Sequence, residues 1–220
     1  MAVEICLIAN NGNGTKTFLI TCKDYTVKEY PLSRVFTLIE PGPALLVATA
    51  EGRKKNIMTI TWSMAMSFAP TFGIVTGPWN HSFDVLMQTR ECVVAVPGVD
   101  LIDKVIGIGT CSGTDTDKFK KFSLTAKKAQ SVRSPLIAEC LFNLECQVSD
   151  CVDAHGIIVL ECVRAWENTD HAERRTFHAV GDGTFVADGE KFDRRREMAS
   201  KLPALSDTPS ATPERVAATR

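Results

Sequence analysis

Residues 44–62 read ALLVATAEGRKKNIMTITW. Residues 44–49 and 56–62 are both rich in apolar and β-branched side chains, which favour strands. The Glu51-Gly52 pair interrupts the pattern between them, and glycine favours a turn. We therefore expect two strands here that pair through a short connection.

Further strand-like runs extend on both sides of this pair. They cover residues 71–75, 92–96, 143–148 and 156–165, and short polar or Gly/Pro segments separate most of them. Near the N-terminus, residues 3–9 and 15–21 alternate around an Asn/Gly-rich turn, which is typical of a β-hairpin. The number of strands predicts a mainly β fold, a β-barrel with a few helices.

Helical patterns are fewer. Apolar residues with helical spacing predict helices over residues 82–88, 100–106 and 115–122, with Ser82 as the N-cap of the first. The last residues, 202–220, contain three prolines and almost no large apolar side chain. Such a segment buries too little apolar surface to offset its ordering entropy, so we expect a disordered tail.

Composition and charge limit the class of protein. The chain has 220 residues, of which 45% are hydrophobic and 23% charged, as in a globular protein with one main domain. The formal net charge of −1 provides no positive field that would gather nucleic acid. No apolar stretch approaches the roughly 18 residues that a membrane span requires. We expect neither nucleic acid nor a membrane as a partner.

The N-terminus and the cysteines indicate the compartment. The first residues lack a basic segment and a cleavage site of the secretory type, so we expect a cytoplasmic protein. The eight cysteines lie mostly inside apolar strand-like runs, where buried free thiols are the simplest interpretation. No Cys-x-x-Cys or His-x-x-x-His pair is present, and we expect no metal site.

The sequence gives little support to a dinucleotide-binding enzyme or to a hydrolase. The glycines of residues 107–113 have the spacing G-x-G-x-x-x-G and follow a predicted helix rather than a strand, which favours a plain loop over a dinucleotide cradle. The chain has no Gly-x-Ser-x-Gly motif of a hydrolase. For Cys111, which has no second cysteine nearby in the sequence, we expect inert packing.

Four short segments, taken in order, are more specific. They are Asn56-x-Met58-Thr59-x-x-Trp62, Asn80-His81-Ser82-Phe83, Gly113-Thr114-Asp115-Thr116-Asp117-Lys118-Phe119 and Gly181-Asp182-Gly183-Thr184-Phe185. With these segments the sequence resembles the flavin reductase-like proteins with an FMN-binding split barrel, and among them most closely the flavoredoxins. The resemblance covers roughly residues 35–190.

The resemblance implies a fold, a cofactor and an assembly. It implies a split barrel of Greek-key type over residues 35–193, preceded by an extension, residues 1–34, and followed by the tail, residues 194–220. It also implies a homodimer with FMN bound noncovalently near the subunit interface. The cofactor-binding residues that it assigns are Asn56, Met58, Thr59, Trp62, Ser63, Asn80, His81, Ser82, Lys118, His155 and Phe185. It assigns no catalytic residue.

The chemistry of FMN suits several of these residues, and each has a simpler alternative. Ser82 at a helix N-terminus fits a phosphate, although a plain N-cap is far commoner. Lys118 fits the same phosphate, or is a surface lysine. Asn56 suits the ribityl hydroxyls or the ring edge, or is a turn residue at a strand end.

The two aromatic residues and the histidine of this set also have two interpretations each. Trp62 can lie along the flavin, whereas core packing is the better interpretation without the resemblance. His155 can contact the cofactor or the nicotinamide, or serve as a structural turn residue. Phe185 can cover a ring face or fill the barrel.

The function implied is hydride transfer from NAD(P)H to FMN, followed by electron transfer to another flavin, a redox partner protein or a small acceptor. The alternative is a noncatalytic FMN-binding electron carrier without its own NAD(P)H site. A third possibility is a split barrel that has lost FMN and serves as a binding module. Reduction of bound FMN by NAD(P)H alone distinguishes the first from the second.

Overall fold

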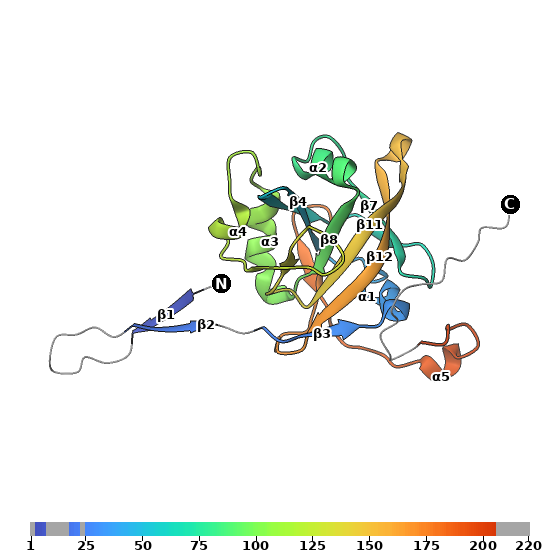
Figure 1. Cartoon of the computed structure of the whole chain (residues 1–220). Coiled ribbons are helices and arrows are strands. Elements are labelled where there is room, and N and C mark those ends of the chain that lie inside the picture. Colours follow the sequence, from blue (N-terminus) through green and yellow to red (C-terminus); the bar gives the residue numbers. More distant parts are fainter. Residues whose placement is uncertain (1–2, 8–17, 23–24, 206–220) are drawn as a thin grey trace.

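The computed structural model describes residues 3–7, 18–22 and 25–205 (Figure 1). The strands of the main sheet are β3 (Val27–Tyr30), β4 (Leu45–Glu51), β5 (Lys54–Ile60), β6 (Ser63–Ala65), β7 (Thr71–Val75), β8 (Glu91–Val96), β11 (Phe142–Val152) and β12 (Ile157–Asn168). Three two-stranded ribbons pair β1 (Val3–Leu7) with β2 (Phe18–Cys22), β9 (Ala126–Lys127) with β10 (Leu136–Ile137), and β13 (Phe177–Ala179) with β14 (Phe185–Ala187).

The helices are short. They are α1 (Phe36–Ile39), α2 (Ser82–Thr89), α3 (Ile102–Gly109), α4 (Lys118–Lys121) and α5 (Arg195–Met198), and single 3-10 turns cover Leu32–Arg34, Val99–Leu101 and Asp153–His155. The helix predicted at 82–88 is confirmed, but His81 occupies its N-cap and no side chain caps it. The prediction that Ser82 is the N-cap is therefore wrong, because Ser82 already has helical geometry. The third predicted helix is shortened to the four residues of α4, since Asp117 caps it.

The main sheet is antiparallel and curls into an open barrel (Figure 1). Its strand order is β5-β4-β8-β11-β12-β7-β6, and β3 pairs with one end of β12. The strand pair expected from residues 44–62 is the β4–β5 hairpin, in which Ala48 faces Ile57 and Thr49 faces Asn56. The predicted mainly β barrel with few helices is confirmed.

The apolar run of β4 is continuous because both of its faces are buried. Leu45 and Val47 point into the barrel core, the apolar cluster inside the curled sheet. Leu46 and Ala48 belong to the outer core, a second cluster between the sheet and α3. A strand covered on both faces loses the alternation of a half-exposed strand. The stretch that indicates the fold therefore lies between two cores.

Parts of the predicted N-terminal extension and of the predicted C-terminal tail belong to the described structure. β1 and β2 pair with each other in the two runs from which a hairpin is predicted, and the turn between them lies outside the described residues. β3 falls within the predicted extension, residues 1–34, yet hydrogen-bonds to β12, so the sheet begins before residue 35. Of the predicted tail, α5 and the residues up to 205 are described, and residues 206–220 lie outside the described residues.

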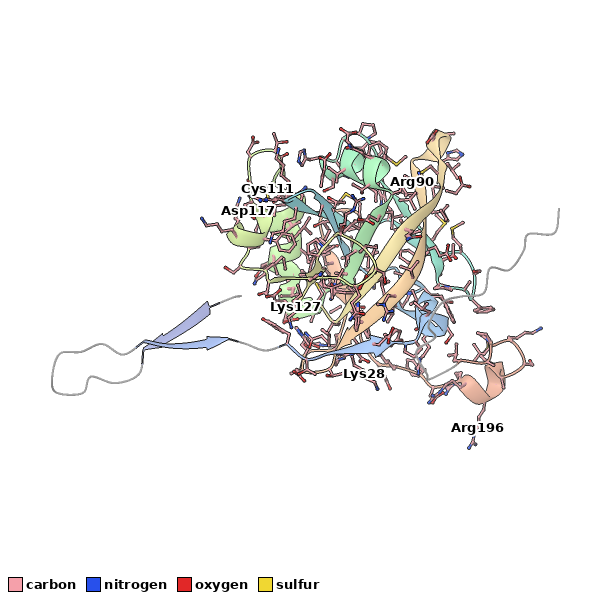
Figure 2. All side chains as sticks on the ribbon, in the orientation of Figure 1. Lys28, Arg90, Cys111, Asp117, Lys127 and Arg196 are labelled. Atoms are coloured by element: carbon pink, nitrogen blue, oxygen red, sulfur yellow. The ribbon has the colours of Figure 1, made fainter. Side chains whose placement is uncertain are left out.

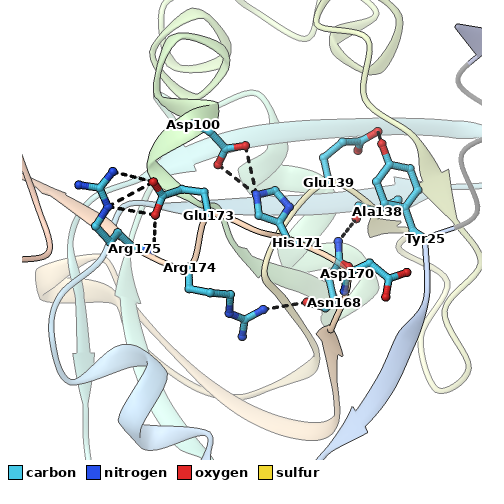
Figure 3. Close-up of polar contacts among 10 residues, drawn as sticks. All are labelled: Tyr25, Asp100, Ala138, Glu139, Asn168, Asp170, His171, Glu173, Arg174 and Arg175. Carbon is cyan, nitrogen blue, oxygen red and sulfur yellow. Dashed lines mark hydrogen bonds and ion pairs between the residues drawn. The ribbon is translucent and has the colours of Figure 1, made fainter.

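Polar contacts hold the loop that follows β12 (Figure 3). His171 Nε2 lies 3.1 Å from both carboxylate oxygens of Asp100, which belongs to the turn just before α3. Asn168 donates a hydrogen bond of 2.9 Å to the carbonyl of Ala138. The first contact joins the loop after β12 to the turn before α3, and the second joins the end of β12 to the segment between β10 and β11.

The cysteines whose side chains are described form no disulfide. Cys92, Cys140, Cys146 and Cys162 are buried as expected, whereas Cys111 and Cys151 are half-buried. Burial raises the pKa of the Cys146 thiol well above its ordinary value, and its neighbours Cys162 and Cys92 raise it further. No helix within the described residues has both the length and the apolar composition needed to cross a membrane.

Candidate functional site

A polar cavity of about 260 Å³ lies where β5, the N-terminus of α2 and the loop after α3 meet. Seven of the residues predicted to bind cofactor line it: Asn56, Met58, Thr59, Asn80, His81, Ser82 and Lys118. Its other walls are Trp79 and residues 108–113. Figure 2 marks the loop wall by Cys111, and Asp117 is labelled beside it. The fold thus brings three distant segments of sequence to one cavity.

Asn56 and Ser82 line this cavity and contact each other. Asn56 Nδ2 donates a hydrogen bond of 2.8 Å to Ser82 Oγ, and the Ser82 side chain is fully buried. Asn56 Oδ1 is buried and has no hydrogen-bond partner in the described part of the chain. A buried acceptor without a partner is costly. The pair therefore leaves one acceptor for a ligand that brings a hydroxyl or an amide.

Gly113 packs directly on the side-chain amide of Asn56. A Cβ built on Gly113 would come closer to all three atoms of that amide than van der Waals contact allows. Only glycine fits this position without displacing Asn56.

Lys118 brings a buried cation to the same cavity. Its Nζ donates a hydrogen bond of 2.9 Å to the carbonyl of Ile108. Desolvation lowers the pKa of Lys118 from its ordinary value of 10.5, and the nearby Cys111 thiol partly opposes that shift. An ammonium has three donors, and this is the one hydrogen bond that it makes to a described residue. The surface-lysine alternative is therefore wrong, and two donors are left for an anion.

Three of the lining residues also hold the walls together. Thr59 Oγ1 donates to the carbonyl of Val105 in α3 at 2.7 Å. Asn80 Nδ2 donates to Thr76 Oγ1 at 3.0 Å, and Thr76 in turn contacts the sulfur of Met58 at 3.9 Å. These side chains fix β5, α3 and the segment before α2 relative to one another.

A second cavity of about 640 Å³, which we call the hairpin cavity, adjoins the polar cavity. The two share Asn56, His81 and Gly113 as walls. The remaining walls of the hairpin cavity come from β4, the β4–β5 turn, the start of β5, α2 and residues 114–117. At the boundary, His81 Nδ1 lies 3.3 Å from Thr114 Oγ1.

A third cavity, of about 480 Å³, which we call the tryptophan cavity, adjoins the polar cavity, because Trp79 lines both. His155 and Phe83 line this tryptophan cavity. The indole of Trp79 is 69% exposed and lies against Gly77, where a Cβ would collide with it. Sequence reasoning did not identify Trp79, although an aromatic three residues before Ser82 in a Gly-Pro-Trp turn is a usable signal.

Three predicted residues line none of these cavities. Trp62 is 66% exposed, so the alternative that it packs in the core is wrong. Ser63 lies next to it on the edge strand β6, and its hydroxyl is buried without a partner in the described chain. Phe185 packs edge-to-face on Phe177 of the outer core, with 5.9 Å between the ring centroids.

The glycine-containing loop after α3 forms part of the site. Residues 107–113 end α3 and continue into the cavity wall, as a plain loop rather than a strand-to-helix phosphate cradle. Cys111, predicted as inert packing, is half-buried at this wall. The usable signal was the adjacent Asp-Lys-Phe segment, which places Lys118 beside the same loop.

Comparison with known proteins bears on what such a site serves. The family model described as "Flavin reductase like domain" matches residues 39–181. An uncharacterized protein of Archaeoglobus fulgidus is 38% identical over 105 residues, which are 47% of this chain and 58% of that relative.

Solved structures share the fold. An FMN-binding domain of a flavin reductase-like enzyme from Shewanella baltica OS155 superposes with a TM-score of 0.71 at 23% identity, covering 77% of this chain and 98% of that one. Flavoredoxin of Desulfovibrio vulgaris (Miyazaki F) gives 0.61 at 16% identity, covering 84% and 97%. The predicted split barrel is confirmed. The family model spans well over half of the chain, so the chain belongs to the family of flavin reductase-like domains.

Proposed function

We propose that this protein is an FMN-dependent oxidoreductase that takes a hydride from NAD(P)H and passes electrons to an acceptor. The observation that carries the proposal is the arrangement of Asn56, the buried Ser82 to which it is hydrogen-bonded, and the buried Lys118 around one polar cavity. Membership of the flavin reductase-like family supports flavin as the ligand.

The donor set fits a phosphate. Ser82 begins the eight-residue helix α2, whose N-terminus favours negative charge. Lys118 contributes a desolvated ammonium, which binds an anion more strongly than an exposed one does. In this proposal Ser82 and Lys118 hold the phosphate of FMN, and His81 and Asn80 line the approach.

The remaining groups fit the other parts of FMN. The unpaired Asn56 Oδ1 accepts a hydrogen bond from a ribityl hydroxyl or from the ring edge. Met58 and Thr59 line the same side of the cavity. Trp79 and Trp62 expose large aromatic faces, against which a planar ring can pack. FMN is therefore bound noncovalently, with polar groups for its chain and aromatic surface for its ring.

When bound, FMN supplies a ring that accepts a hydride and releases electrons singly or in pairs. The residues of this chain bind and orient, and no side chain has to act as an acid or a base. We propose that the tryptophan cavity, with His155 at its wall, receives the nicotinamide, because it adjoins the polar cavity through Trp79.

A homodimer belongs to the same proposal. Trp62, Met64, Met66 and Phe68 are exposed apolar side chains on and beside β6, the edge strand of the main sheet. A group of this kind on one edge indicates an interface. A second copy would cover this group of side chains and Ser63. Phe185 remains a proposed cofactor contact, although it lines none of the three cavities of the single chain. The six cysteines whose side chains are described are unpaired, which supports a reducing compartment, the cytoplasm.

The test is an absorption spectrum of the full-length protein after incubation with FMN and removal of free flavin. Under anaerobic conditions, NADH and then NADPH are added, and dithionite follows as the positive control for reduction. Bleaching of the flavin bands by either nicotinamide supports the oxidoreductase. Bands that persist until dithionite is added favour the noncatalytic carrier, and absence of bound flavin contradicts both.

A further inference from the structure

An open groove of about 190 Å³, which we call the basic groove, lies between the β4–β5 turn and the loop that joins β9 to β10. Among the described residues that line it are six cations and no carboxylate. The cations are Arg53, Lys54, Lys55, Lys127, Lys128 and Arg133. Because the whole chain has a formal net charge of −1, this groove is a local concentration of positive charge.

Two carboxylates hold the loop between β9 and β10 in place. Glu145, which is fully buried, accepts hydrogen bonds from the backbone N–H groups of Gln130 and Val132 at 3.0 and 3.2 Å. Arg133 donates to the Glu91 carboxylate through its backbone N–H at 2.8 Å and through its Nε at 2.6 Å. The loop is therefore fixed before any partner arrives, and binding does not have to order it.

Three cations of the basic groove are exposed and not engaged within the chain. Arg53, Lys54 and Lys128 form no hydrogen bond, ion pair or cation–π contact with another described residue. Lys127 differs, because its ammonium donates a hydrogen bond of 2.6 Å to the carbonyl of Tyr25. At the three unengaged positions, an anionic surface can pair with the groove without first breaking an ion pair of this chain.

The basic groove adjoins the candidate flavin site. Arg53, Lys54 and Lys55 line both the groove and the hairpin cavity, and the hairpin cavity shares Asn56 with the polar cavity. We propose that the basic groove docks an acidic electron-transfer protein, which serves as the electron acceptor of this chain. The inference rests on the proposed function, because only the proposed reduction of FMN provides electrons for such a partner.

The chemistry of the proposed reaction suits a docked carrier. NADH delivers two electrons as a hydride, so two molecules of a one-electron partner accept one electron each, and NAD+ and one proton are released. A carrier has to leave after each transfer, and complementary surface charge speeds association more than it raises affinity. Nucleic acid fits the groove less well, because none of its described lining residues is an aromatic on which a base could stack.

The test uses two haem proteins of opposite charge as probes, the acidic cytochrome b5 and the basic cytochrome c. Titration calorimetry measures the binding of each to the full-length protein without nicotinamide, at about 0.1 M and about 1 M salt, where the Debye lengths are about 10 Å and about 3 Å. We expect cytochrome b5 to bind at the lower salt concentration and to be released at the higher one. Cytochrome c should bind at neither.

Charge reversal locates the binding surface. Arg53→Glu together with Lys128→Glu should weaken cytochrome b5 binding at least about tenfold at the lower salt concentration. The matched control, Lys28→Glu with Lys201→Glu, changes the net charge equally at two exposed lysines that do not line the groove, and Lys28 lies on β3 (Figure 2). It should weaken binding much less. With FMN and NADH present, the haem absorbance should show that reduction of cytochrome b5 slows in the groove variant and not in the control.

The inference and the proposed function can fail separately. If cytochrome b5 binds no better than cytochrome c, or if both double variants weaken its binding equally, the inference is overturned, and bleaching of bound FMN by NADH still supports the proposed function. If a DNA duplex binds more tightly than cytochrome b5 and the groove variant loses it, the groove serves nucleic acid and the inference is wrong. If NADH does not bleach bound FMN, the proposed function is overturned, and the role of the groove partner as electron acceptor falls with it.

Discussion

Asn56 and Ser82, which lie 26 positions apart, are joined by a hydrogen bond of 2.8 Å from the asparagine amide to the serine hydroxyl. The bond connects β5 to the first residue of α2, and both residues line the polar cavity, while the buried Asn56 carbonyl oxygen has no partner in the described chain. A strand side chain and a helix N-terminus thereby become parts of one binding surface.

Replacing Ser82 with alanine should weaken FMN binding about tenfold, the effect of losing one charge-assisted hydrogen bond. It should also lower the free energy of unfolding by about 1 kcal/mol, because the Asn56 amide loses its acceptor in a partly buried position. Titration calorimetry and urea unfolding measure the two effects. Riboflavin, which has no phosphate, is the control ligand. An equal loss for riboflavin and FMN would argue against a phosphate contact at Ser82.

Lys118 predicts how FMN affinity depends on pH. Its pKa is lowered from 10.5 in the free protein, mainly by burial, and a bound phosphate stabilises the ammonium and raises that pKa. FMN affinity is therefore at its maximum below the pKa that Lys118 has in the flavin-free protein, and it falls as pH rises through that pKa. We expect Lys118→Arg to remove this loss, since arginine keeps its charge, and Lys118→Met to weaken binding already at neutral pH. Titrations from about pH 7 to about pH 10 test this.

The same lowered pKa predicts a trend in stability. Between the folded-state pKa and the ordinary value of 10.5, the unfolded chain binds more protons than the folded one. Burial of the charged lysine therefore destabilises the folded protein fully below that pH range, and this destabilisation decreases as pH rises through the range. Relative to the wild type, Lys118→Met should be more stable at neutral pH, by a margin that narrows at high pH. A margin that does not change with pH would contradict the buried charge.

Gly113 should not tolerate a methyl group. Gly113→Ala forces the Asn56 amide to move, because the added Cβ would overlap it, so we expect FMN affinity to fall at least about tenfold. The matched control is Gly189→Ala, whose Cβ would meet no atom within 4 Å and whose backbone is not left-handed. Comparison of the two dissociation constants separates a local clash from a general effect of replacing glycine. Similar constants for both variants would contradict the close packing on Asn56.

The exposed edge of β6 predicts the assembly. Met64 is 44% exposed beside Trp62, and Met64→Lys places a charge in the proposed interface. We expect this variant to sediment as a monomer at concentrations where the wild type is a dimer, because an unpaired charge buried at an interface costs several kcal/mol. Met198→Lys, on α5 and 48% exposed, is the control and should leave the dimer intact. A wild type that is monomeric would contradict the proposed homodimer.

The class of fold could be predicted from the sequence because the patterns that indicate strands and helices are local. Alternating and continuous apolar runs indicated the strands, and the buried strand β4 kept a continuous run because it has a core on each face. The helix at Ser82 was equally local, although its exact N-cap was not, since the start of a helix depends on the turn before it. The ordered motifs indicated the family and seven of the fourteen residues that line the polar cavity.

What only the tertiary structure decided is how those residues meet and which side chains are already engaged. Trp62 is exposed at a sheet edge rather than buried, Lys118 is buried rather than exposed, and Phe185 lies on Phe177. Burial depends on which elements pack together across long separations in the chain, and no local pattern encodes it. The same holds for Trp79 and for the hairpin cavity, which exist because β4, β5, α2 and the loop after α3 converge in space.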